Sequence, residues 1–297
     1  MHRDDAYLID FREIVDSMAE MKRSMTPIIL LVVAIVSVQG GAALAKTLFA
    51  EIGPEGVTAW RLGFSAIILL LVFQPWKRNL PKKNRINLLY YGIAIGTMNF
   101  LFYQSLNRLH IGIAVGLEFT GPLLVAILSS RRPVDFIWIL LVIAGLLFLL
   151  PWGENSDVDP IGVLYALSAG AFWALYIIFG QKTGMEFGIS ASGIGLGIGA
   201  LIYFPVGLAM QGSALFSLDI LPLAFGVALL SSAIPFALEL YVLAKLPKKT
   251  FGTLTSLDPA FGALAGFFLL NEVLTVTQWC ALLAIIVASV GASSTGR

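Results

Sequence analysis

The segment GLEFTGPL, residues 116–123, places a carboxylate, a glycine and a proline inside an otherwise apolar run. Pro122 has no N–H, so the carbonyl of Glu118 loses its helical partner, and Gly121 lets the backbone deviate there. Because proline suits the first position of a helix, a fresh half-helix with a partially positive N-terminus can begin here. A carboxylate, a free carbonyl and a helix N-terminus within one turn predict a zwitterion site. We therefore take Glu118, Thr120, Gly121 and Pro122 as candidate contacts.

A second break lies in SLDPA, residues 256–260, where Pro259 frees the carbonyl of Thr255. Asp258 stands just before the proline, where an N-cap belongs, so it is either a structural cap or a contact for substrate or a proton. Glu118 is about seven residues, or about 11 Å, from the outer edge of its apolar run. Acids at such depth in a membrane are candidates for function. We expect Glu118 to handle substrate or a proton, with a buried ion pair as the alternative.

Five further polar or aromatic side chains are candidates for the same site. Gln39 precedes two glycines, where a backbone can approach a ligand or another helix, and Asn99 and Tyr103 are four residues apart on one helical face. For these three, an interhelical hydrogen bond is the alternative to ligand contact. Trp173 and Tyr176 either wall the cavity or pack as ordinary aromatic residues.

Two charged residues are assigned to the edges of the membrane instead. Arg61 falls near the expected outer end of the second apolar segment, which favours a snorkelling or ion-paired structural role, with Glu118 as a candidate partner. Glu239 falls towards the cytoplasmic end of the eighth segment, which favours a boundary role.

The elements that must position these residues are transmembrane helices. Of the 297 residues, 58% are hydrophobic and 12% are charged, and the mean hydropathy is +0.88. Soluble chains are about 45–50% apolar and about 25% charged, so the sequence predicts an all-α polytopic membrane protein. Ten apolar segments approach the roughly 20 residues that a spanning helix needs. They lie at about residues 27–45, 57–73, 86–106, 111–128, 136–150, 161–180, 190–210, 220–244, 251–270 and 275–291.

The distribution of charge predicts the orientation of these spans. With the N-terminus inside, most lysines and arginines fall in inner loops, and the acidic stretch WGENSDVDP falls outside, as the positive-inside rule requires. Both termini are therefore expected in the cytoplasm. A formal net charge of +1 gives no sign of nucleic-acid binding, and two histidines leave little for a metal site. We expect no metal and no cofactor.

The two halves of the chain resemble each other. When Pro122 is placed over Pro259, Asp135 falls on Glu272 at the same spacing. With five spans in each half, the second copy must enter the membrane upside down, and inverted repeats are typical of secondary transporters. The expected units are a cytosolic tail or interfacial helix (1–24), a first repeat (25–151), a periplasmic linker (152–159) and a second repeat (160–297).

Several motifs resemble those of the drug/metabolite transporter superfamily, in proteins built from two tandem EamA-type five-helix units. They are SVQGGAALAKTLF, GVTAWRL, MNFLFYQSL, GIAVGLEFTGPL and FGTLTSLDPA. Within the superfamily, the pattern is most similar to that of bacterial inner-membrane exporters of threonine and homoserine. The resemblance implies export of small amino acids across the cytoplasmic membrane by proton antiport. The alternative is an exporter of lipophilic cations, drugs or another small metabolite.

An enzyme is the remaining alternative, and the sequence does not favour it. An intramembrane hydrolase would need clustered nucleophile, base or metal ligands, and the chain contains neither HExxH nor GxSxG. We therefore expect a transporter that is not an enzyme, with an amino acid, protons and the lipid bilayer as its partners.

Overall fold

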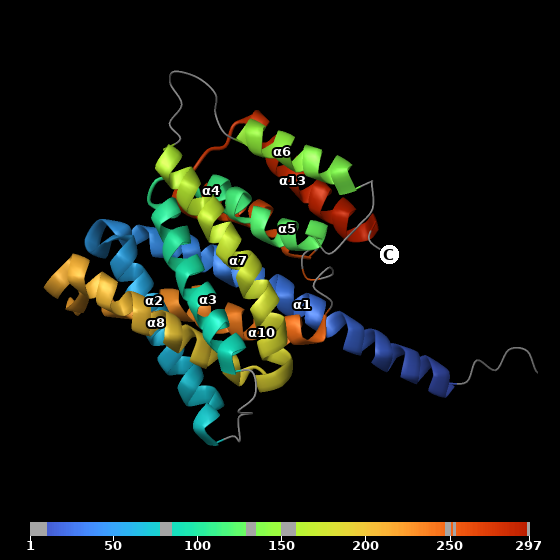
Figure 1. Cartoon of the computed structure of the whole chain (residues 1–297), viewed down its shortest axis with the longest axis horizontal. Helices are drawn as coiled ribbons and strands as arrows, with labels where there is room; N and C mark the ends of the chain where they lie inside the picture. Colours follow the sequence, from blue (N-terminus) through green and yellow to red (C-terminus); the bar gives the residue numbers. More distant parts are fainter. Residues whose placement is uncertain are drawn as a thin grey trace, which may run out of the picture.

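The computed structural model describes residues 11–77, 85–128, 135–149, 159–246, 251 and 254–295, and in this part of the chain the regular structure is helical. The α-helices are α1 (Phe11–Thr47), α2 (Phe49–Phe73), α3 (Arg85–Leu106), α4 (Ile111–Glu118), α5 (Thr120–Leu128), α6 (Asp135–Leu149), α7 (Pro160–Phe187), α8 (Ser190–Gln211), α9 (Leu221–Ala228), α10 (Ile234–Lys245), α12 (Asp258–Leu270) and α13 (Val276–Thr295) (Figure 1). Short 3₁₀ segments cover Pro75–Lys77 and Gly212–Phe216, and a π-helical turn, η3, covers Leu229–Ala233.

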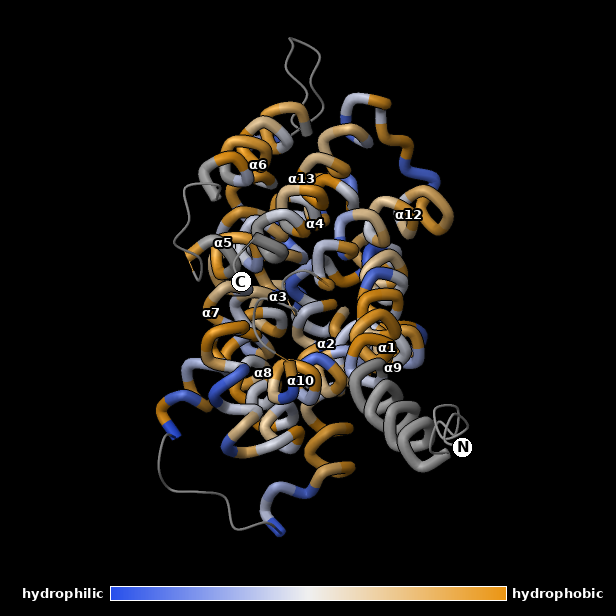
Figure 2. Tube along the Cα trace, turned by 90° about the vertical axis from the view of Figure 1, so that its right-hand side faces the viewer, coloured by the Kyte–Doolittle hydropathy of each residue, from blue (hydrophilic) through white to orange (hydrophobic). Residues whose placement is uncertain are grey.

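Six of the described helices are long and apolar enough to cross a membrane. They are Thr26–Thr47, Phe49–Lys77, Arg85–Leu106, Pro160–Phe187, Ser190–Phe216 and Leu221–Lys245. Shorter apolar helices cover Ile111–Val125, Asp258–Leu270 and Val276–Ala288. Hydrophobic residues predominate along the helices (Figure 2), and large apolar side chains such as Leu201 are exposed on the outside, as expected of a surface that faces lipid. The other four of the ten expected spans stay a prediction.

In its described part, the segment expected as a tail or interfacial helix, residues 1–24, is not separate from the first span in the structure. Helix α1 starts at Phe11 and continues without interruption into the first candidate span. Part of the segment expected as a tail or interfacial helix thus belongs to the same helix as the span. Residues 1–10, the core of the expected linker (152–158) and the basic loop residues Arg131 and Arg132 lie outside the described residues.

The predicted interruptions of the fourth and ninth segments are present. Helix α4 ends at Glu118, Phe119 separates it from α5, and α5 begins at Thr120. Helix α12 begins at Asp258, directly before Pro259. The eighth segment has a break that the sequence did not suggest, the π-helical turn η3 between α9 and α10. Such turns interrupt the regular i→i−4 ladder and are frequent at functional sites.

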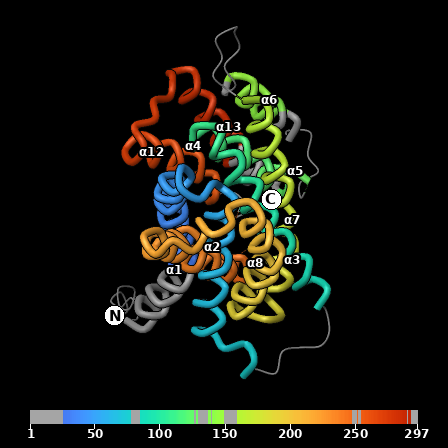
Figure 3. Tube along the Cα trace, turned by 90° about the vertical axis from the view of Figure 1, so that its left-hand side faces the viewer, coloured from blue at the N-terminus to red at the C-terminus, as the bar shows by residue number. Residues whose placement is uncertain are grey.

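The packing of the helices is nearly unchanged when the two halves of the chain are exchanged. Helix α2 packs on α8 and α6 on α13, and each of these pairs joins equivalent helices of the two halves. Helix α4 packs on α12, and these two belong to equivalent segments, the fourth and the ninth. The contact of α3 with α7 has its counterpart in the contact of α1 with α10. Figures 1 and 3 show α6 and α13 side by side at one edge, next to α4. The centre of the molecule is therefore built by both halves together.

Candidate substrate-binding site

A small polar cavity lies where seven of the described helices meet, α1, α2, α3, α4, α7, α10 and α12. Its volume is about 40 Å³, which is room for a few water molecules at roughly 10–15 Å³ each. It is lined by Val38, Gln39, Arg61, Met98, Asn99, Phe102, Glu118, Trp173, Phe236, Glu239 and Asp258. Three carboxyl groups and one guanidinium thus share one space with two amides and an apolar wall.

Glu118 occupies the last position of α4 and is 6% exposed. Its side chain lines the cavity and makes no hydrogen bond to another described residue. The interruption after Glu118 ends α4 at the cavity, so the break positions the carboxylate. This agrees with the place expected for it, although the expected ion pair with Arg61 is not formed: among the described residues, the salt bridges are Lys46–Glu272 and Arg108–Asp159.

Asp258 is held by a hydrogen bond across the cavity. Gln39 Nε2 donates to Asp258 Oδ1 at 3.1 Å, which joins α1 to the start of α12. The N-cap of α12 is Leu257, and no side chain caps this end, so the interpretation of Asp258 as a cap is wrong. A buried, hydrogen-bonded carboxyl group in the wall of a cavity fits the other interpretation, a contact for substrate or a proton.

Arg61 is buried inside the helix bundle, so the expectation of snorkelling is wrong. Helix α2 is kinked at Ile52 and Gly53, and its regular part begins at Pro54, earlier than the sequence suggested. Arg61 lies about two turns beyond the kink and is 2% exposed. Its Nη2 donates to the carbonyl oxygen of Ser231 in η3. The guanidinium carbon lies 4.6 Å from the ring centre of Tyr103 and 5.7 Å from that of Phe236. Arginine stacks well on aromatic faces, which fixes its plane here.

Glu239 is a second correction, because it belongs to the cavity rather than to the cytoplasmic boundary. It is 6% exposed, lines the cavity and accepts a hydrogen bond from the Tyr176 hydroxyl at 3.0 Å. Tyr176 itself is fully buried and packs between Tyr91 and Phe236. Its role in the structure is therefore to hold Glu239.

Of the remaining aromatic and amide candidates, two line the cavity and one packs behind a residue that lines it. Asn99 and Trp173 line the cavity, and the Asn99 amide also donates to Ile95 O within its own helix at 2.6 Å. Tyr103 does not line the cavity but stands behind it, with its ring against Arg61 and its hydroxyl 3.4 Å from Ser231 Oγ.

Thr120, Gly121 and Pro122 lie outside this cavity. A Cβ added at Gly121 would stand 1.9 Å from the carbonyl oxygen of Gly170, and one added at Gly170 would stand 2.6 Å from that of Glu118. The carbonyl expected as a ligand therefore lies against α7. Thr120 Oγ1 donates to Leu117 O at 2.7 Å. Gly121 thus serves the close packing of α5 on α7, a role that the sequence alone did not distinguish from a ligand site.

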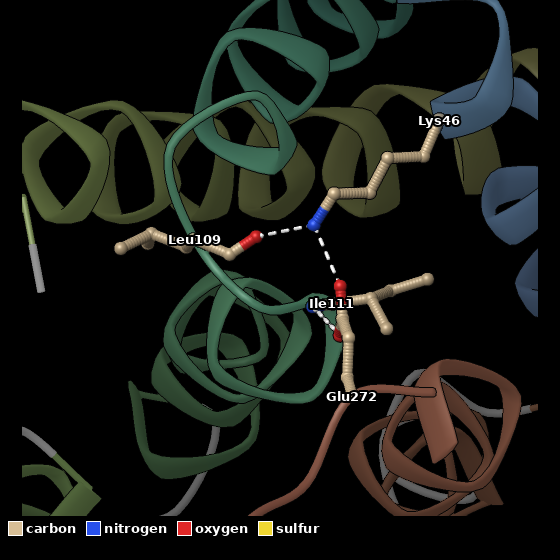
Figure 4. Close-up of polar contacts among 4 residues, drawn as sticks. All are labelled: Lys46, Leu109, Ile111 and Glu272. Atoms are coloured by element: carbon tan, nitrogen blue, oxygen red, sulfur yellow. Dashed lines mark hydrogen bonds and ion pairs between the residues drawn. The ribbon is translucent and has the colours of Figure 1, made fainter. Parts of the chain in front are cut away.

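A second polar cluster joins the two halves away from the cavity. Lys46 Nζ, at the end of α1, lies 2.7 Å from Glu272 Oε1 and donates to Leu109 O at 2.8 Å (Figure 4). The other carboxylate oxygen of Glu272 accepts from the backbone N–H of Ile111 at 2.7 Å, the first residue of α4. Glu272 follows α12, so one carboxylate connects the last turn of α1, the start of α4 and the α12–α13 connection.

A more exposed pair lies at the start of α7. Arg108 Nη1 donates to Asp159 Oδ2 at 2.5 Å, and Asp159 Oδ1 also accepts from Ile161 N as the N-cap of α7. The hydrogen bond from Arg108 holds the pKa of Asp159 below its usual range. Within the described residues, no three histidine, cysteine, aspartate or glutamate side chains are grouped so that they could hold a metal ion.

Comparison with known proteins assigns the chain to a family. The model of the EamA-like transporter family matches residues 25–151 and 160–294, which together are most of the chain and form two copies. The chain belongs to the EamA-like transporter family. It is a multi-pass protein of the bacterial cytoplasmic membrane within the drug/metabolite transporter superfamily.

Named relatives match most of the length of this EamA-like transporter. The threonine/homoserine exporter RhtA of Escherichia coli (strain K12) is 50% identical over 272 residues, 91% of this chain and 92% of that protein. An uncharacterized transporter of Bacillus subtilis (strain 168), YwfM, is 27% identical over 238 residues, 74% of this chain and 69% of that protein. One solved crystal structure, 14% identical, superposes with a TM-score of 0.67 over 92% of this chain and 98% of its own, and it supports the fold alone.

Two cavity residues were misplaced by sequence reasoning, although a usable signal was present. Arg61 and Glu239 are both charged residues inside apolar segments, and an intramembrane charge is by default a functional candidate. For Arg61, the hydrophobic pattern placed the start of the segment at about residue 57, whereas the regular helix begins at Pro54. For Glu239, the expected segment agrees with the observed Leu221–Lys245, and what the pattern lacked was the packing that turns this residue into the cavity. The cavity contacts of Val38, Met98, Phe102 and Phe236 carry no signal in the sequence, because they are apolar residues among apolar neighbours.

Proposed function

We propose that the chain exports small amino acids such as threonine and homoserine across the cytoplasmic membrane, as a secondary transporter driven by proton antiport. The identity to the threonine/homoserine exporter RhtA over 91% of the chain supports the substrate class. The central cavity supports it independently, because its groups suit a zwitterion: carboxylates for the ammonium group and a guanidinium for the carboxylate.

The architecture that we propose for this function has ten spans, arranged as two inverted five-helix repeats, with both termini in the cytoplasm. The repeats are residues 25–151 and 160–297, separated by a periplasmic linker at 152–159 and preceded by a cytosolic segment at 1–24. The exchange symmetry of the helix packing supports this arrangement. Inverted repeats with a site at their interface suit alternating access, in which one half moves against the other around the substrate.

Proton coupling fits the charge content of the cavity. Carboxyl groups from Glu118, Glu239 and Asp258 outnumber the single guanidinium of Arg61, and all four side chains are buried. Buried charges are costly unless paired, so protons or an ammonium group must compensate the excess. A site that exchanges an ammonium group for protons is the basis of antiport.

Export of lipophilic cations or drugs is the alternative, and Arg61 argues against it. A fixed positive charge in the wall repels a cation and offers donors that a lipophilic cation cannot accept from. A site that binds only cations is expected to contain carboxyl groups but no buried guanidinium, whereas this cavity contains both.

Counterflow in liposomes tests the proposal. Purified protein is reconstituted with unlabelled threonine or homoserine inside, and uptake of labelled threonine is measured. We expect uptake that protein-free liposomes do not show, and acid-inside liposomes should accumulate threonine until a protonophore is added. Exchange of lipophilic cations with no exchange of any small amino acid would overturn the proposal.

A further inference from the structure

Arg61 leaves most of its hydrogen-bond donors unused although it is 2% exposed. A guanidinium has five N–H groups. Nη2 donates to Ser231 O, whereas Nε and Nη1 have no hydrogen-bond partner among the described residues. Leaving buried donors unpaired costs free energy, more for charged groups. Such an arrangement is expected where a ligand supplies the missing acceptors for part of the working cycle.

The geometry of the fork suits a carboxylate. Nη2 is shared by the two edges of the guanidinium, Nε–Nη2 and Nη1–Nη2, and it carries two hydrogens. Since the Ser231 carbonyl takes one of them, one edge keeps two N–H groups on two nitrogens, which is the bidentate pattern that a carboxylate accepts. The rings of Tyr103 and Phe236 hold the guanidinium plane, so little rotamer freedom is lost on binding.

No carboxylate of the protein takes this place in the described part of the chain. Glu118, Glu239 and Asp258 line the same cavity, yet none has an oxygen within the 4.0 Å of a salt bridge to Arg61. Asp258 and Glu239 instead accept from Gln39 and Tyr176. Positive and negative groups thus stand apart across the cavity, as the two ends of an amino acid do.

We infer that Arg61 is the anchor for the α-carboxylate of the transported amino acid. The inference rests on the proposed function and deepens it, because it makes a carboxylate a requirement for substrates. A ligand with the ammonium group and side chain but without the carboxylate should bind weakly. Arginine at this position would then set the class of substrate, while the carboxyl groups on the other side receive the ammonium group.

The test compares threonine with its amino alcohol, in which a CH₂OH group replaces the carboxylate. Both compete for threonine counterflow and, in detergent, both are scored by the thermal shift of the purified protein. For the parent protein, threonine should compete at least about tenfold better, as expected from two charge-assisted hydrogen bonds. In Arg61→Gln the preference should fall to about one, and in Arg61→Lys, which keeps the charge without the fork, it should be intermediate.

Arg108→Gln is the matched control, because it removes the same charge from an exposed pair outside the cavity and should keep the parent preference. If threonine and its amino alcohol compete equally well for the parent protein, the inference is wrong, even if no variant folds. If threonine is exchanged and the preference survives in Arg61→Gln, the inference fails while the proposed function stands. If the parent protein neither binds nor exchanges any small amino acid, the proposed function itself fails.

Discussion

Glu118 and Glu51 are both glutamates of the first half, but their surroundings give them different roles. Glu118 is 6% exposed in the cavity wall, whereas Glu51 is exposed in the first turn of α2. Glu118→Gln keeps the size and removes the charge and the titratable proton. We expect it to insert normally and to lose accumulation in acid-inside liposomes, because either the ammonium contact or the coupled proton is gone. Uptake by the reconstituted variant measures this.

The same variant separates the two roles of Glu118. Loss of threonine binding together with transport indicates the ammonium contact, whereas retained counterflow without accumulation indicates the proton. Glu51→Gln is the control and should behave as the parent does. A Glu118→Gln protein that accumulates threonine at the parent rate would mean that this carboxylate has only a structural part.

Gln39 illustrates how the wall of the site is also part of the fold. Its Nε2 donates to Asp258 Oδ1, and this bond connects α1 of the first half to α12 of the second. Gln39→Leu leaves the buried Asp258 without its partner. We expect a loss of about 1–3 kcal/mol in stability, measured as a lower midpoint of thermal unfolding in detergent. An unchanged midpoint would show that water replaces the amide.

At the scale of elements, the close approach of α5 to α7 depends on Gly121, which has no side chain. Gly121→Ala would put a Cβ 1.9 Å from the Gly170 carbonyl oxygen, so the helices must separate. Overpacking of this kind costs about 1–3 kcal/mol or more, and the melting temperature should fall accordingly. Gly40→Ala is the matched control: its Cβ would meet nothing within 4 Å, so stability should stay or rise slightly. Equal melting of the two variants would contradict this packing.

The connection through Glu272 makes a second prediction at this scale. Glu272→Gln keeps a hydrogen bond to Ile111 N but removes the partner of Lys46 in a pair whose side chains are 22% and 10% exposed. We expect a destabilisation of about 1–2 kcal/mol, between the values typical of exposed and buried pairs. Asp159→Asn, in the more exposed pair with Arg108, should change the melting temperature much less. The prediction is wrong if the two variants melt alike.

For the whole molecule, the orientation is open to a direct experiment. A reporter fused after Asp157 should be periplasmic and one fused after Lys182 cytoplasmic, because only the second lies on a side rich in basic residues. Paired fusions of alkaline phosphatase and a fluorescent protein at each site would measure this. Both fusion sites on one side of the membrane would rule out two inverted repeats.

How much of this molecule could be predicted depended on whether the information was local. Composition predicted a helical membrane protein, and proline and glycine predicted the breaks after Glu118 and before Pro259, because backbone chemistry acts within one turn. Which residues pack against each break depends on contacts between segments that are distant in the sequence. Gly121 was therefore interpreted as a ligand contact, whereas in the structure it packs against Gly170. The partners that hold Arg61 in the cavity wall, Ser231 and Tyr103, are likewise distant from it in the sequence.

The size of the cavity has a consequence for how tightly a substrate is held. At about 40 Å³, the space admits a few waters but not an amino acid, so this conformation is one that the substrate does not occupy. Binding must draw on a wider conformer, and the apparent dissociation constant is the intrinsic one divided by the fraction of molecules in that conformer. If one molecule in about a hundred were open, the measured affinity would be about a hundredfold weaker than the contacts alone allow. Weak affinity would then reflect the rarity of the open conformer, and an exporter that binds weakly releases its cargo readily.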